Sequence, residues 1–229
     1  MTTLYTGAPS ASAMRLVVVA ERLFARHGID GVSLRQIAAE AGSANNSAVH
    51  YHFGSKQGLV ASIFNHRLPQ ILNDRKMLAA RCDPDDLRSR YEAHFLPVLT
   101  MAEATDNRYV SFVEQIQRSD LATTPDLLEL PAEGLRSADE FREDMHRLLV
   151  DIEEPIRDHR ITEAQAFSLH AAADRERAVA SGIAVIAFEA FANSHFDGMA
   201  GFLSAPVSQA TTRRLRAVDA ADAARLGQL

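Results

Sequence analysis

The segment of residues 31–56, GVSLRQIAAEAGSANNSAVHYHFGSK, decides the fold of the amino-terminal part of the chain. Ser33 and Gln36 have the spacing of a capping box, in which the two side chains satisfy backbone amides at the start of a helix. Val32 and Ile37 occupy the two positions of a hydrophobic staple, which fixes how the chain enters the helix. Together they predict a short helix, and the glycine that follows is the residue expected where a helix ends.

A second short helix is expected from residue 44 or 45 to His52. Because a helix advances about 100° per residue, Ala48 and Val49 fall on one side and are expected to pack inward. The opposite side carries hydrogen-bonding side chains and almost no charge. These outward residues are Asn46, Ser47, His50 and Tyr51.

Such a polar, nearly uncharged helix face suits hydrogen bonding in a DNA groove. Asn can bind adenine through two hydrogen bonds, Ser can reach a base or a phosphate, and His can donate to a guanine edge. Side chains that flank this face, or that start the first helix, suit phosphate contacts, which position a protein without reading sequence. The candidate DNA-binding residues are Ser33, Arg35, Asn45, Asn46, Ser47, His50, Tyr51, His52 and Lys56. A solvent-facing helix of another kind could carry the same residue types, and it is the tandem of two short helices that favours DNA.

Residues 14–67 resemble the amino-terminal domain of the TetR family of bacterial transcriptional regulators. The resemblance implies a three-helix DNA-binding domain, with a helix-turn-helix at about residues 34–53, followed by a larger helical domain for ligand binding and dimerisation. One departure is that many relatives carry Leu-Tyr where this chain has Val49 and His50, so imidazole stands where a phenol is usual. The segments that carry the resemblance are residues 20–25 (AERLFA), Gly28 with residues 31–38 (GVSLRQIA), and residues 51–56 (YHFGSK).

Charge is divided unevenly along the chain. The 229 residues have a net charge of −6, which by itself argues against a nucleic-acid partner. Residues 1–67, however, contain six Arg or Lys and three Asp or Glu, whereas residues 68–229 contain 18 and 27. This asymmetry is typical of a small DNA-contacting head on a body that DNA does not touch. Because the cations of the head are few, affinity should depend on dimerisation and base contacts.

The remainder of the chain predicts helices and no convincing strands, so the fold class is all-α. Asp83 followed by proline predicts a helix start, and Ser137 with Glu140 predicts another through a capping box. Pro69 marks either a hinge or a plain break within a long helical segment, and residues 123–136 form an irregular link. The expected helices span residues 56–80, 84–104, 107–119, 137–150, 155–177 and 183–203.

The last expected helix, residues 183–203, is the most apolar and needs something to cover it. It can be buried within one subunit, or it can meet its twin in a four-helix dimer bundle. The resemblance favours a homodimer formed through residues 155–177 and 183–203. The expected organisation is a flexible tail (1–13), a DNA-binding domain (14–67), a ligand-binding and dimerisation domain (68–206) and a polar tail (207–229).

The signal for a ligand pocket is weak. Aromatic and Met side chains at helical spacing are more often plain core than pocket. Because no charge is clustered among the candidates, a small and largely apolar effector is favoured. The candidate pocket residues are Tyr91, His94, Phe95, Met101, Tyr109, Phe112, Gln115 and Met145.

Other kinds of chemistry are not indicated. His50 and His52 lie two residues apart, which does not place both imidazoles on one helix face, so no metal site is expected. The single cysteine, Cys82, excludes an internal disulfide and fits a reducing compartment. Neither a phosphate-binding glycine loop nor a nucleophile elbow is present. We expect no catalytic residues, no cofactor and no membrane partner, and a cytoplasmic, nucleoid-associated protein.

The function predicted from the sequence is a regulator that binds double-stranded operator DNA as a homodimer. We expect a repressor that a small effector, of a chemical identity the sequence does not give, releases from its operator. Two alternatives stay open: an activator, and an all-α small-molecule binding protein or enzyme whose head no longer reads DNA. Turnover of a candidate ligand without any operator would identify the last of these.

Overall fold

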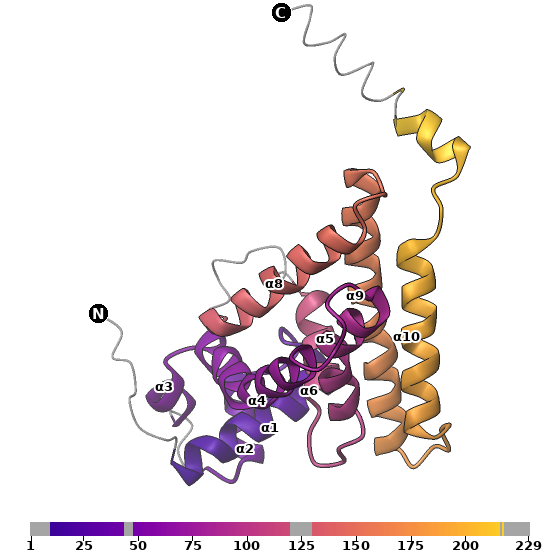
Figure 1. The fold of residues 1–229 in the computed structure, drawn as a ribbon. Coiled ribbons are helices and arrows are strands. Elements are labelled where there is room, and N and C mark those ends of the chain that lie inside the picture. The colour runs from indigo at the N-terminus through magenta and orange to yellow at the C-terminus, as the bar shows by residue number, and fades with distance from the viewer. Residues whose placement is uncertain (1–9, 44–47, 120–129, 216, 218–229) are drawn as a thin grey trace, which may run out of the picture.

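The computed structural model describes residues 10–43, 48–119, 130–215 and 217, and it is helical throughout, with no strand among these residues (Figure 1). This confirms the all-α class. The helices are α1 (Ala11–His27), α2 (Leu34–Glu40), α3 (Ala48–Phe53), α4 (Lys56–Ala79), α5 (Leu87–Met101), α6 (Tyr109–Gln117), α8 (Ala132–Leu148), α9 (Glu154–Ala180) and α10 (Phe188–Ser204). None of the described helices is long and apolar enough to cross a membrane.

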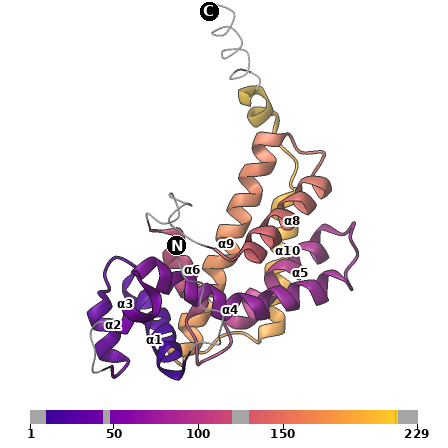
Figure 2. The same cartoon turned by 90° about the vertical axis from the view of Figure 1, so that its left-hand side faces the viewer.

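The short helices α2 and α3 lie at one end of the molecule with α1, and the long helices α9 and α10 run side by side away from them (Figures 1 and 2). Helix α4 follows α3 in the chain and packs against α5, while α6 lies between α1 and α9. The amino-terminal head is therefore joined to the body through two contacts, the continuous helix α4 and the packing of α1 on α6.

Local signals set the ends of the head helices as the sequence predicts. The Ser33 hydroxyl accepts a hydrogen bond from the Gln36 amide at 3.1 Å and caps α2. Both staple residues, Val32 and Ile37, are buried. Gly42 follows α2 with a φ of 68°, in the left-handed region that a side chain disfavours.

Helix α4 continues through Pro69 without ending, so a plain break at this position is wrong. Proline removes only one backbone donor. Leu59, Ile63, Ile71 and Leu72 are buried on both sides of it, and their packing holds the two halves in one helix.

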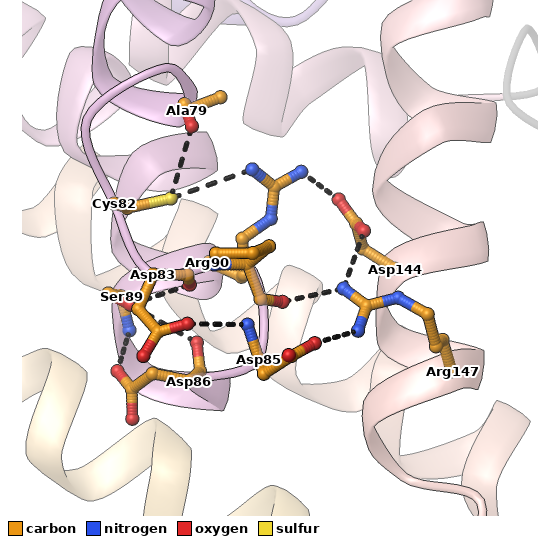
Figure 3. A network of polar contacts seen from close by, with 10 residues as sticks. Ala79, Cys82, Asp83, Asp85, Asp86, Ser89, Arg90, Asp144 and Arg147 are labelled. Carbon is orange, nitrogen blue, oxygen red and sulfur yellow. Dashed lines mark hydrogen bonds and ion pairs between the residues drawn. The ribbon is translucent and has the colours of Figure 1, made fainter.

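Helix α5 begins at Leu87, three residues later than expected, because Asp86 rather than Asp83 caps it (Figure 3). The Asp86 carboxylate accepts from the Ser89 amide at 2.7 Å. The Asp83 carboxylate instead accepts from the Asp85 amide at 2.9 Å and closes a turn before the helix. Backbone hydrogen bonding lowers the pKa of Asp86, as expected for a capping carboxylate.

Two other predicted helix starts are also wrong. Helix α8 begins after Pro131, so Ser137 lies inside it rather than at its start. Helix α10 begins at Phe188, and residues 183–187 precede it in a non-helical, exposed conformation. The β-branched residues of that segment have low helix propensity. Beyond the expected end of the body, residues 209–215 are helical.

A single hydrophobic core connects head and body. Phe24 of α1 stacks on Phe112 of α6 with 6.3 Å between ring centroids, and Phe64 of α4 lies 5.4 Å from the same ring. All three side chains are buried. A displacement of α6 in the body therefore cannot leave α1 in the head unaffected, because close-packed interiors transmit such shifts.

Candidate nucleic-acid interface and ligand cavity

The described part of α3 has one buried side and one exposed side, as the helical wheel predicts. Val49 is fully buried, whereas Tyr51 is 77% exposed and His50 is also exposed. His52 is half-buried, and its ring packs edge-on against Tyr51 with 5.0 Å between centroids. Asn45, Asn46 and Ser47 lie outside the described residues, so their predicted base contacts stay a prediction.

His50 has a defined tautomer when its ring is neutral. Its Nδ1 lies 3.0 Å from the carbonyl oxygen of Gly54. Because a carbonyl only accepts, Nδ1 must carry the proton, and Nε2 of the neutral ring is then an acceptor. A neutral His50 thus matches the amino groups of adenine or cytosine, and it can donate to guanine only in its charged form.

The turn between α3 and α4 is held tightly. A Cβ added to Gly58 would lie 2.1 Å from the Phe53 carbonyl oxygen, so only glycine fits there. The Ser55 hydroxyl accepts from the Gly58 amide at 3.0 Å and caps α4. Lys56 Nζ donates to the Ile29 carbonyl oxygen at 2.9 Å, which ties this turn to the loop between α1 and α2. Lys56 therefore has a structural contact besides its predicted phosphate contact.

The first helix of the pair also carries two predicted contacts. Ser33 and Arg35 are both exposed at the start of α2. The Ser33 hydroxyl already accepts from a backbone amide, so its remaining capacity is to donate to a phosphate oxygen. Arg35 places a cation beside it, and the amino-terminal end of a helix favours anions.

A buried carboxylate, which the sequence analysis did not single out, joins the head to the body. Glu21 of α1 is 1% exposed and forms an ion pair with Arg67 of α4 at 2.7 Å. It also accepts from the backbone amide of Arg108 at 2.9 Å, one residue before α6. The signal was an acidic residue on the apolar side of the helix, beside Ala20 and Phe24.

A second buried carboxylate reaches the same end of α6 from the opposite side. Glu176 of α9 accepts from the amides of Val110 and Ser111, both at 3.0 Å. Burial raises the pKa of Glu176, while its hydrogen bonds to Ser111 and Val110 oppose that effect. The start of α6 is thus held between a head residue and a residue of the long helix α9.

A cavity of about 330 Å³ lies among α4, α5, α6, α8 and α9. Its wall is mainly apolar, with a few polar side chains, as in small-molecule sites. Of the predicted pocket residues, it brings together His94, Phe95 and Tyr109. The apolar wall includes Phe64, Leu68, Ile71, Val98, Val110, Val113 and Leu169, and the other polar members are Arg75, Gln117 and Gln165.

The other five predicted pocket residues do not line this cavity. Tyr91, Phe112 and Met145 are fully buried core. The Tyr91 hydroxyl lies 2.7 Å from Ser168 Oγ, which lies 2.8 Å from His195 Nε2, so its polar end is satisfied within the core. Gln115 lines a separate cleft between α1 and α6, and Met101 lies at the end of α5.

Arg75 is the charged residue among the cavity residues that the sequence did not single out. Its Nε donates to the His94 carbonyl oxygen at 2.9 Å and its Nη1 donates to Ser137 Oγ at 3.2 Å. Burial lowers the pKa of Arg75 to about 10. Burial also lowers the pKa of His94 well below its usual value, with Arg75 and Arg90 acting in the same direction. Arg75 recurs with Leu68, Ile71 and Leu72 at helical spacing, and that position on an apolar face was the available signal.

Comparisons with known proteins agree with this arrangement. Residues 16–63 match the sequence model described as bacterial regulatory proteins, tetR family. The HTH-type transcriptional repressor SCO4008 of Streptomyces coelicolor is 34% identical over 79 residues, which are 34% of this chain and 38% of that protein. The alignment therefore spans little more than a third of this curated relative.

Two solved structures share the fold at low identity. The fatty acid degradation regulator FadR of Bacillus halodurans superposes with a TM-score of 0.55 at 11% identity, over 85% of this chain and 97% of that one. A transcriptional regulator of Rhodococcus sp. Rha1 gives 0.53 at 22% identity, over 84% and 96%. Both are named as regulators.

The fold and the head define a class of protein, in which a helix-turn-helix domain is carried on a helical body. The matched head, the curated relative and the shared fold place the chain within that class. Residues 16–63 are similar to the tetR family of bacterial regulatory proteins, and the chain shares its fold with the two solved structures.

Proposed function

We propose that this protein is a homodimeric repressor that binds operator DNA and is released from it by a small molecule. The observation that carries the proposal is the tetR-type head, in which Val49 anchors α3 and His50 and Tyr51 face outward. The curated relative is a transcriptional repressor by name, which supports repression rather than activation. Residues 46, 47 and 50 contact the bases. The residues that contact the phosphates or lie beside them are Ser33, Arg35, Asn45, Tyr51, His52 and Lys56.

Dimerisation through α9 and α10 supplies the two-fold geometry that paired recognition helices need. Half-sites on B-DNA lie about 34–36 Å apart, and a dimer presents two copies of α3. The proposal is supported by exposed aromatic side chains on this pair of helices: Phe167 is 55% exposed and Phe202 is 38% exposed. Gly198 and Gly201 leave open space where a partner helix can approach closely.

Release by an effector requires the cavity and the head to share a movable element, and α6 is suited to that role. Tyr109, Val110 and Val113 line the cavity, while Glu21 and Glu176 hold the start of α6. An effector that shifts α6 alters the packing of α1 and the spacing of the two heads. The coupling is reciprocal, so operator DNA must weaken effector binding by the same factor.

The test is an electrophoretic mobility shift with the promoter DNA beside the gene of this protein. We expect a sequence-dependent complex that weakens as salt increases. His50→Ala should lose discrimination between operator and scrambled DNA, whereas Leu135→Glu, on the exposed side of α8, should bind as the parent does. A complex that forms equally on scrambled DNA, or none at low salt, would rule out the proposal.

A further inference from the structure

We propose that the effector is an amphipathic carboxylate, whose carboxylate pairs with Arg75 and whose apolar part fills the cavity. This inference rests on the proposed function for its regulatory meaning, but the binding itself does not depend on DNA. It replaces the largely apolar effector expected from the sequence with a ligand that has a charged end.

The first argument is the unmatched charge of Arg75. Among the described residues, no carboxylate lies within ion-pair distance of its guanidinium. Arg75 is half-buried, and a cation that is partly removed from water is destabilising when no opposite charge offsets its desolvation. Burial is the main influence on the pKa of Arg75, and no acid is among the groups that influence it. An anionic ligand would supply the missing partner.

The second argument is the number of donors that Arg75 leaves unused. A guanidinium has five N–H groups in a planar fork. One Nε–H is taken by the His94 carbonyl oxygen and one Nη1–H by Ser137. Three remain without a partner among the described residues, enough for a two-bond contact with one carboxylate.

Asp144, an acid of α8 that lines a second cavity with Arg75, already has ion-pair partners. Asp144 is bound by both Arg90 and Arg147, which also clamp the turn before α5 to α8 (Figure 3). Arg147 reaches Asp85 at 2.7 Å in the same network. Asp144 therefore has its own cations and is not free to serve Arg75.

The third argument is the position of Arg75 between two cavities of different character. It lines the mainly apolar cavity described above and also a smaller second cavity of about 190 Å³. The second cavity is lined by charged side chains of both signs, the cations Lys76, Arg90 and Arg136 and the acids Glu133, Glu140 and Asp144. His94 also lines both. A molecule whose apolar chain occupies the mainly apolar cavity and whose anionic end lies at Arg75, where the two cavities meet, fits this arrangement.

The test uses decanoate, decanol and decyl phosphate as probes of one chain length, with binding measured by isothermal titration calorimetry on the full chain. We expect decanoate to bind at least tenfold more tightly than decanol and more tightly than decyl phosphate. Arg75→Met should lose at least tenfold in decanoate affinity without losing affinity for decanol. The matched control Arg81→Met, an exposed residue outside both cavities, should change neither.

Thermal unfolding of the variant gives an independent readout. Arg75→Met also removes the hydrogen bonds to the His94 carbonyl oxygen and to Ser137, so the readout is the effect of ligand: decanoate should raise the melting temperature of the parent more than that of the variant. An equal increase in both proteins would mean that Arg75 does not bind the carboxylate and would overturn the proposal. Equal binding of decanol and decanoate, preference for decyl phosphate, or no decanoate binding would also overturn it.

The outcome is separable from that of the proposed function. A sequence-specific DNA complex that forms while decanoate fails to bind would reject only the carboxylate. Decanoate binding that depends on Arg75, without any operator complex, would support the carboxylate and reject the repressor. If both hold, decanoate should dissociate the complex of the parent protein but not that of Arg75→Met.

Discussion

The Glu21 carboxylate accepts two hydrogen bonds from the Arg67 guanidinium, from Nε at 2.7 Å and from Nη2 at 3.1 Å. The pair joins α1 to α4, and the same carboxylate holds the amide of Arg108 ahead of α6. One side chain therefore links the head, the connecting helix and the start of the helix that lines the cavity. Because Glu21 is almost completely buried, removal of one partner of the ion pair is costly, since it leaves the other charge without a counter-charge.

Glu21→Gln should destabilise the protein by about 3 kcal/mol, because it leaves the largely buried Arg67 without a counter-charge. Chemical denaturation measures the change. The matched control is Glu40→Gln, whose partner Arg22 is exposed, so its loss should be at most about 1 kcal/mol. Equal effects of the two substitutions would mean that the buried pair has no special role.

Variants that lose a base contact and variants that lose a phosphate contact should differ in how their DNA affinity depends on salt concentration. His50→Ala should cost about 1–3 kcal/mol on the operator and relax specificity. Arg35→Ala should weaken all DNA sequences alike and reduce the salt slope by about one. Fluorescence anisotropy at several salt concentrations measures both. If the two variants behave alike, His50 does not read bases.

Lys56 needs a separate experiment because it also bonds to Ile29. Lys56→Met should lower affinity for every sequence, reduce the salt slope and lower the melting temperature of the head. Lys56→Arg keeps the charge and can keep the contact, so it should restore the salt slope. A variant that loses stability while its salt slope is unchanged would show that Lys56 makes no phosphate contact.

The parts of this fold that the sequence predicts are those that depend on neighbouring residues. Ser33 caps α2 and Gly42 follows it because the signals lie within a few residues of one another. Asp83 and Asp86 were both able to cap α5. Arg147 of α8 binds Asp85 and the Pro84 carbonyl oxygen, and such a contact from outside the segment cannot be read from local spacing.

The candidate cavity could be predicted only in part for the same reason. His94, Phe95 and Tyr109 were found because aromatic residues on body helices are natural candidates. Tyr91 has the same appearance in sequence, yet its hydroxyl is used inside the core by Ser168. Arg75 escapes this reasoning because its importance lies in having no ion-pair partner among the described residues, although acids line the same cavity. That property depends on which distant side chains surround it.

Acid should weaken the fold through His94. Its pKa is lowered in the folded state, so the stability it contributes is fully present above the unfolded value of about 6.5 and is lost as pH falls toward the folded value. In that window the unfolded chain binds more protons, and stability should fall by up to about 1.4 kcal/mol per pH unit for this group. Burial also lowers the pKa values of His66 and His195, which act in the same direction.

His94→Phe isolates this contribution, because it keeps an aromatic ring stacked on Phe141 but cannot take up a proton. Denaturation curves between pH 7 and pH 5 should show a shallower loss of stability for the variant than for the parent. Replacing the surface residue His159 in the same way is the control. An unchanged pH dependence in His94→Phe would mean that this imidazole is not titrated on unfolding.

The proposed dimer can be tested at a single aromatic ring. One face of Phe167 lies parallel to the His195 ring, with 6.0 Å between centroids, and the side chain is 55% exposed. Phe167→Glu places a charge where an apolar contact is expected, so light scattering should report a monomer. Operator affinity should then fall, because one head retains contacts with one half-site only. Leu135→Glu, at a residue 49% exposed on α8, is the matched control and should leave the dimer intact. If Leu135→Glu dissociates the dimer and Phe167→Glu does not, the interface lies on α8 and not on α9 and α10.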